Sequence, residues 1–211
     1  MKTVHMAVYD TLADWEVGAA VAHINNRAWQ REPGAFQVRT VGLTLDPVVT
    51  MGGVRIVPDL AVADLAPEDS VMLILAGAET WMGEELVPFA RKAREFVEAG
   101  VPVAGMCGAT FGLAKEGLLD ERRHTSNVAE YLQYSGYAGG ANYVDEPAVT
   151  DGDVITASGT APFDFAREVL GRLGVYESHV LDGWYRLYAN SDPAGYAVLA
   201  EYEARQLAAA Q

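Results

Sequence analysis

The stretch that decides the fold runs from Gly100 to Asp120 and reads "GVPVAGMCGATFGLAKEGLLD". A short apolar run of strand character ends at Cys107, and apolar residues at helical spacing follow it as far as Gly117. A glycine directly after such a run is typical of a helix C-terminus. The sequence therefore predicts a strand, a sharp turn and a helix, with the cysteine in the turn.

Cys107 is the only cysteine of the chain, and the segment 105–109 has the form G-x-C-x-A. This form resembles the nucleophile elbow G-x-S-x-G, with sulfur in place of the hydroxyl. Free cysteines are among the most buried residue types, so an unreactive core cysteine is the alternative. Because the N–H groups of a helix that begins beside the sulfur favour a thiolate, we expect the pKa of Cys107 to lie below its usual value of about 8.5.

Strand and helix patterns alternate outward from this segment. The same criteria predict further strands at 3–10, 36–44 and 70–76, two short extended pieces around Gly52-Gly53, and a hairpin at Asp151-Gly152. Helices are expected at 14–29, starting near a cap at Asp14, and at 84–100, 161–173 and 194–209. The pattern indicates an α/β three-layer sandwich with a mostly parallel central sheet. Ligands bind at the carboxyl ends of the strands in such sheets, and Cys107 falls at such an end.

Length and charge limit the classes of protein that fit. The chain has 211 residues, half of them apolar, and a formal net charge of −14, which predicts one domain over residues 1–211. An acidic surface of this kind repels nucleic acid and anionic membranes, so neither is expected as a partner. Asp10 interrupts the region that a signal peptide would need, and no apolar run is long enough to span a membrane. We expect a cytoplasmic protein.

Four segments, in order, resemble the ThiJ/PfpI family: "YDTLADWE", "LILAGAETW", "AGMCGATFGLAKEGLLDERRHTSN" and "TASGTAPFDFAREVL". The cysteine segment is the most specific of them. The resemblance implies a flavodoxin-like fold related to the class I glutamine amidotransferase domains, and commonly a homodimer. Relatives in this family include the Parkinson-disease-associated deglycase, glyoxalase III, intracellular peptidases and isonitrile hydratase.

The resemblance also implies a site around Cys107. The acidic residue of the family falls on Glu16, with Asp14 as the alternative, and its protonated carboxyl would donate to the sulfur. Backbone N–H groups that stabilise an anion would come from Gly108 and from the loop at Gly77 and Ala78. Many relatives carry two glycines in that loop, so Ala78 is a departure.

A larger departure concerns the catalytic base. Relatives that keep a histidine near the cysteine often read R-R-x-T-T-H, and the matching segment here, "RRHTSN", places Asn127 at the histidine position. His124 lies three residues earlier, and both residues are accessory candidates. A late H-x-E pair, which completes the triad of true glutamine amidotransferases, is missing, so glutamine hydrolysis is disfavoured. His5, His23 and His179 show no metal-ligand spacing, and neither a metal nor a cofactor is expected.

Two functions from different classes remain. In the first, Cys107 attacks a small-molecule electrophile such as an aldehyde, amide or isonitrile, as in a hydrolase, lyase or glyoxalase-type enzyme linked to stress response. In the second, Cys107 is oxidised to a sulfinate held by Glu16 in a redox-responsive stress protein without turnover. The absence of a histidine at position 127 favours the second, because release of a covalent adduct needs acid–base help. A purely structural or chaperone-like dimer has less support.

Overall fold

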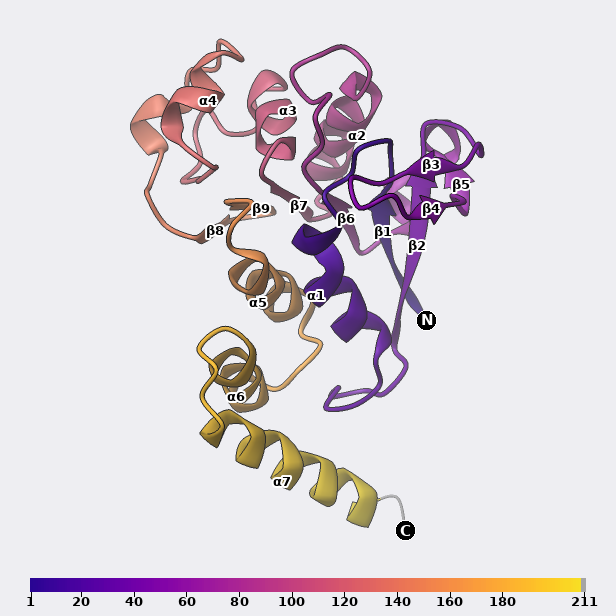
Figure 1. Cartoon of the computed structure of the whole chain (residues 1–211), viewed down its shortest axis with the longest axis vertical. Coiled ribbons are helices and arrows are strands. Elements are labelled where there is room, and N and C mark those ends of the chain that lie inside the picture. The colour runs from indigo at the N-terminus through magenta and orange to yellow at the C-terminus, as the bar shows by residue number, and fades with distance from the viewer. Residues whose placement is uncertain (210–211) are drawn as a thin grey trace.

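A seven-stranded sheet forms the centre of the computed structural model, which describes residues 1–209 (Figure 1). Its strands lie in the order β5-β2-β1-β6-β7-β9-β8, and every neighbouring pair is parallel except the β8–β9 hairpin. The strands of this sheet are β1 (Lys2–Ala7), β2 (Phe36–Gly42), β5 (Leu60–Ala61), β6 (Met72–Leu75), β7 (Val103–Met106), β8 (Ala148–Asp151) and β9 (Val154–Ala157). The predicted fold is confirmed.

Helices cover both faces of the sheet (Figure 1). One face carries α2 and α3, with α4 beyond them, and the other carries α1 and α5. The helices are α1 (Asp14–Asn25), α2 (Val87–Glu98), α3 (Ala109–Lys115), α4 (Ala129–Gln133), α5 (Pro162–Leu173), α6 (Ser178–Tyr188) and α7 (Ala194–Ala209). Short 3-10 turns occur at Val62–Asp64, Pro67–Asp69 and Gly139–Asn142. Within residues 1–209, no helix has both the length and the apolar character that crossing a membrane requires.

Three neighbouring strands of the sheet are buried along their whole length. Every residue of β6, β7 and β9 is buried, which explains why Thr156 is the one polar residue in these three strands, since helices cover a parallel sheet on both faces. Helix α2 instead buries a single stripe against the sheet, formed by Phe89, Ala90, Ala93 and Phe96. The 3.6-residue period of this apolar stripe is the pattern that predicts a helix in this part of the sequence.

The region around Asp14 differs in part from the prediction. Helix α1 begins at Asp14, but its carboxylate does not cap the helix: it accepts hydrogen bonds from Thr50 Oγ1 at 2.5 Å and from Gly52 N at 2.6 Å. These bonds tie the small hairpin of β3 (Val48–Val49) and β4 (Arg55–Ile56) to the start of α1. Asp14 therefore holds the hairpin against α1, and it is not the acidic residue beside the cysteine.

Helices α6 and α7 pack against each other on the outer side of α1 and α5 (Figure 1). The buried ring of His23, in α1, joins this pair to the rest of the chain: Nδ1 lies 2.8 Å from Tyr176 Oη, and Nε2 accepts from Trp184 Nε1 at 3.0 Å. An indole N–H can only donate, so the neutral ring must carry its proton on Nδ1. Burial lowers the pKa of His23 from 6.5 to about 4.

We predict that His23 makes the fold sensitive to acid. Protonation would place a second N–H against the Trp184 N–H, so the charged form is disfavoured in the folded state. The neutral His23 ring contributes its full share to the free energy of unfolding above pH 6.5, the pKa of histidine in the unfolded chain. This contribution is lost as the pH falls toward about 4, and the loss between pH 7 and pH 4 is about 3 kcal/mol. Urea unfolding at both pH values should show that His23→Gln loses less stability on acidification than wild type by about this amount.

His179→Gln is the matched control, because His179 is exposed and pairs only with Glu177. This control should keep the acid sensitivity of the wild type. An equal loss of stability in wild type and His23→Gln would contradict the assignment to His23.

Candidate active site

Cys107 lies in the turn between β7 and α3 with a φ of +54°, in the left-handed region that non-glycine residues seldom occupy. Its backbone N–H donates to the Ala157 carbonyl of β9 at 2.9 Å, and its carbonyl accepts from Thr110 Oγ1 at 2.6 Å. These bonds hold the strained turn on both sides, and the side chain remains partly exposed. The predicted elbow geometry is present.

The Glu16 carboxyl lies beside the sulfur and has no exposed surface. Its Oε2 accepts from the backbone N–H of Gly77 at 2.5 Å, while Oε1 has no hydrogen-bond partner among the described residues. Helix α1 supplies Glu16 from its first turn, and the end of β6 supplies Gly77, so two neighbouring strand-to-helix connections meet at Cys107. The structure thus brings Glu16 and Cys107 together.

Two glycines make room for this arrangement. A Cβ on Gly77 would fall 2.8 Å from Glu16 Oε1 and 2.9 Å from Cys107 Sγ, and a Cβ on Gly159 would fall 3.0 Å and 2.9 Å from the same two atoms. Real Cβ atoms essentially never come closer than 3.0 Å to another heavy atom, and a contact at 3.0 Å is tighter than most. The carboxyl oxygen and the sulfur therefore line one small space that only glycine backbones can border.

Asn127 contacts the sulfur directly. Its Nδ2 donates to Cys107 Sγ at 3.2 Å, and its Oδ1 accepts from the backbone N–H of Gly159 at 2.8 Å. The second bond fixes which end of the amide faces the sulfur, because only the oxygen can accept from an N–H. Asn127 is thus a donor to Cys107 that does not titrate.

His124 is placed away from this function. The ring is fully buried, with Nδ1 2.7 Å from the Arg122 carbonyl and Nε2 3.1 Å from Tyr137 Oη. Both nitrogens therefore have hydrogen-bond partners, one in the same loop and one beyond α4, and burial lowers the pKa of His124. Neither contact involves the cysteine, so His124 has a structural role here.

The backbone donors are arranged differently from the prediction in one respect. The N–H of Gly77 is engaged by Glu16 and is not directed at a substrate. The N–H of Gly108 lies at the sulfur, where it helps to lower the pKa of Cys107. The N–H of Ala78 has no acceptor within residues 1–209, and the Ala78 carbonyl lies beside Gly108. Gly108 is therefore the backbone donor at the sulfur, and Ala78 offers a second N–H that has no acceptor among these residues.

Burial controls the protonation of the pair. Removal from water raises the pKa of Glu16 to about 7, although the bond from Gly77 opposes the shift. Burial and the negative charge of Glu16 raise the pKa of Cys107 to about 11, against smaller lowering effects from Asn127 and Gly108. The expectation of a lowered thiol pKa is wrong. At neutral pH the sulfur keeps its proton and Glu16 is about half ionised.

Sequence reasoning missed three residues at the site. Gly159 approaches the sulfur from the end of β9, Trp15 Nε1 donates to the Gly159 carbonyl at 2.9 Å, and Tyr131 Oη lies 3.4 Å from the Gly108 carbonyl. The segment "TASGTAPFDFAREVL" carried a signal for Gly159, because it belonged to the family resemblance. Nothing in the sequence pointed to Tyr131, which lies on the short helix α4.

A cysteine in a strained strand-to-helix turn, beside a buried carboxyl and on a mostly parallel sheet, defines a class of proteins. The model of the DJ-1/PfpI family matches residues 2–172, and the chain belongs to this family. A crystal structure of a thiJ/pfpI family protein from Bacillus anthracis is 37% identical, with a TM-score of 0.90 over 96% of this chain and 98% of that one.

Relatives carry different names. The "Uncharacterized protease YoaZ" of Bacillus subtilis (strain 168) is 37% identical over 91% of this chain and 93% of its own length. The "Glutathione-independent glyoxalase DJR-1.2" of Caenorhabditis elegans is more distant, at 27% identity over 66% of this chain and 75% of its own. The family thus has both protease-named and glyoxalase-named members similar to this chain.

We predict that Glu16→Gln lowers the pKa of the Cys107 thiol. The substitution keeps the shape of the side chain and removes the negative charge that opposes thiolate formation. The pH dependence of iodoacetamide labelling of Cys107 measures the shift. Glu79→Gln is the control, because this carboxyl is exposed on the same β6 loop and should leave the profile unchanged.

A higher thiol pKa in Glu16→Gln would contradict this prediction. It would show that a protonated Glu16 donates to the thiolate, as the family resemblance implied.

Proposed function

We propose that this protein is a cysteine-dependent enzyme acting on small reactive carbonyl compounds, with Cys107 as the nucleophile and Glu16 as its base. The observation that carries the proposal is the buried carboxyl of Glu16 beside a cysteine in a strained, partly exposed turn. A base works best with a pKa near the working pH, and burial brings the pKa of Glu16 to about 7.

The first step needs only groups that lie at the site. The Glu16 carboxylate takes the thiol proton while Cys107 Sγ forms a bond to the carbonyl carbon. The π electron pair moves to the carbonyl oxygen, and this oxyanion accepts hydrogen bonds from the N–H groups of Gly108 and Ala78. Glu16, now a carboxylic acid, can return the proton to that oxygen or to a leaving group.

Aldehydes fit the site better than peptides. Addition to an aldehyde requires one proton transfer, whereas cleavage of an amide also requires protonation of an amine and activation of a water. Asn127 occupies the place from which a histidine would help, and its amide does not titrate. The glyoxalase name of one relative agrees with this preference, and the protease name of YoaZ points to the harder reaction.

A redox-responsive role without turnover is the second candidate. Oxygen atoms of a sulfinate on Cys107 would lie close to the Glu16 carboxyl and to the backbones of Gly77 and Gly159, which border the sulfur. Each oxygen would come from one peroxide molecule, which is reduced to water as the sulfur is oxidised. Asn127 and Gly108 would donate to these oxygens.

Turnover of methylglyoxal tests the leading proposal. We expect slow consumption that increases as the pH rises through about 7, because the ionised form of Glu16 is the active one. Cys107→Ala should abolish it, and Glu16→Gln should reduce it by about 10²–10⁴. Asn127→His should raise hydrolysis of an activated ester such as p-nitrophenyl acetate, since it adds a titrating group at the sulfur.

Two outcomes would count against it. Turnover that is unchanged in Cys107→Ala would remove the nucleophile. Absence of turnover, together with sulfinate on Cys107 before oxidation of any of the six methionines under mild peroxide, would support the redox-responsive role instead.

We further propose that the chain forms a homodimer through an exposed apolar surface made of Trp15, Met51 and Val54. These side chains are 54%, 45% and 55% exposed and line a common hollow. Exposed apolar surfaces of this kind mark interfaces, and a second copy is the partner that the family resemblance implies.

Size-exclusion chromatography with light scattering should show a dimer for the wild type and a monomer for Val54→Asp. Val57 is an exposed valine outside the hollow, so Val57→Asp should remain dimeric.

A further inference from the structure

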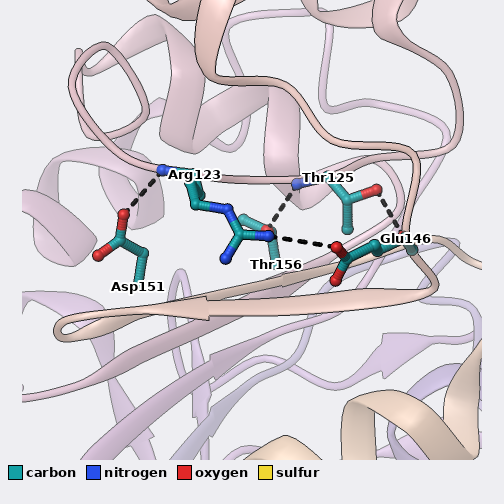
Figure 2. A network of polar contacts seen from close by, with 5 residues as sticks. All are labelled: Arg123, Thr125, Glu146, Asp151 and Thr156. Carbon is teal, nitrogen blue, oxygen red and sulfur yellow. Dashed lines mark hydrogen bonds and ion pairs between the residues drawn. The ribbon is translucent and has the colours of Figure 1, made fainter.

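Asn127 is exposed, and its position depends on the loop that precedes it. Figure 2 shows how residues 123–125 of this loop are fastened to the β8–β9 hairpin. The N–H of Arg123 donates to Asp151 Oδ2 at 2.8 Å, and the N–H of Thr125 donates to Thr156 Oγ1 at 2.9 Å. The Thr125 hydroxyl donates to the Glu146 carbonyl at 2.8 Å. Two backbone N–H groups and one side-chain hydroxyl of the loop are thus hydrogen-bonded to the β8–β9 hairpin and to the residues just before it.

These contacts differ in strength. The ion pair between Arg123 and Glu146, at 3.2 Å, joins side chains that are 60% and 53% exposed, so solvent weakens it. Thr125 and Thr156 are each 1% exposed, and loss of the Thr156 hydroxyl would leave a buried N–H without an acceptor. Loss of the Thr125–Thr156 bond is therefore costlier than loss of the exposed ion pair, and both are drawn in Figure 2.

Strand β9 fixes both ends of the contact between Asn127 and the sulfur. Thr156 holds the loop that carries Asn127, and the next residue, Ala157, accepts from the Cys107 N–H. Gly159, just beyond the strand, donates to Asn127 Oδ1. A displacement of the loop along β9 would therefore lengthen the Asn127–Cys107 contact while the cysteine stayed in place.

We propose that Thr156 is a positioning residue whose hydroxyl sets the distance between the Asn127 amide and the Cys107 sulfur. The inference rests on the proposed role of Cys107 as nucleophile. Thr156 touches neither the sulfur nor a substrate, and it acts through Asn127. Because the Asn127 donor favours the thiolate, loss of the Thr156 hydroxyl makes Cys107 less reactive.

The test is the rate of iodoacetamide alkylation of Cys107 between pH 7 and pH 9, followed by mass spectrometry on the intact protein. Thr156→Val should slow alkylation by about tenfold, the usual scale for a hydrogen bond to a charged group. Thr156→Ser, which keeps the hydroxyl, should restore the wild-type rate. Thr150→Val is the matched control: this threonine lies on β8 and its hydroxyl donates to Glu168, so the rate should not change.

Asn127→Ala provides the decisive comparison. If Thr156 acts through Asn127, the double variant Thr156→Val/Asn127→Ala alkylates no more slowly than Asn127→Ala alone. Multiplied effects in the double variant, or a wild-type rate in Thr156→Val, would overturn the inference. A wild-type rate in Asn127→Ala would also overturn it, without bearing on methylglyoxal turnover. Thr156→Ala removes the same hydroxyl and replaces Thr156→Val if circular dichroism shows that the latter is unfolded.

Discussion

The site depends on how little room the Cys107 sulfur has. A left-handed turn places it at the carboxyl edge of the sheet, and two backbones without side chains, at Gly77 and Gly159, approach it as closely as glycine allows. Only this close approach lets a fully buried carboxyl lie beside a thiol. The elements that meet here, β6, β7, β9 and the start of α1, must therefore keep their relative positions within a few tenths of an ångström.

Protonation of the pair follows from the same crowding. Water that would solvate a carboxylate or a thiolate is excluded, so each group holds its proton more tightly than in solution. At the sulfur the adjacent carboxylate adds to the effect of burial, because its charge opposes a second negative charge. The turn at Cys107 thus provides geometry, while reactivity depends on a proton transfer between two neighbouring groups.

Much of the fold could be predicted because its signals are local. The apolar run before Cys107, the helical spacing after it and the turn at Gly152 each depend on a few consecutive residues, and all three are present as expected. Gly159 could not be placed against Cys107 from spacing alone, because that contact depends on β9 pairing with β7 across about fifty residues.

The direction of side chains and their exposure to solvent could not be predicted from the sequence either. His124 could be counted in a motif, but its inward orientation toward Tyr137 depends on the loop that returns to it. A helix N-terminus beside Cys107 was visible in the sequence, whereas the loss of solvent around the sulfur was not. The latter effect prevails, and the expected direction of the thiol pKa is reversed.

The helical pair at the end of the chain lies beyond the segment that the family model matches. A chain that ended at residue 172 would still contain every strand of the sheet and every residue near the sulfur. It would nevertheless leave the outer face of α1 uncovered, with His23 deprived of both Tyr176 and Trp184. Residues beyond the segment that the family model matches therefore contribute to the buried surroundings of α1.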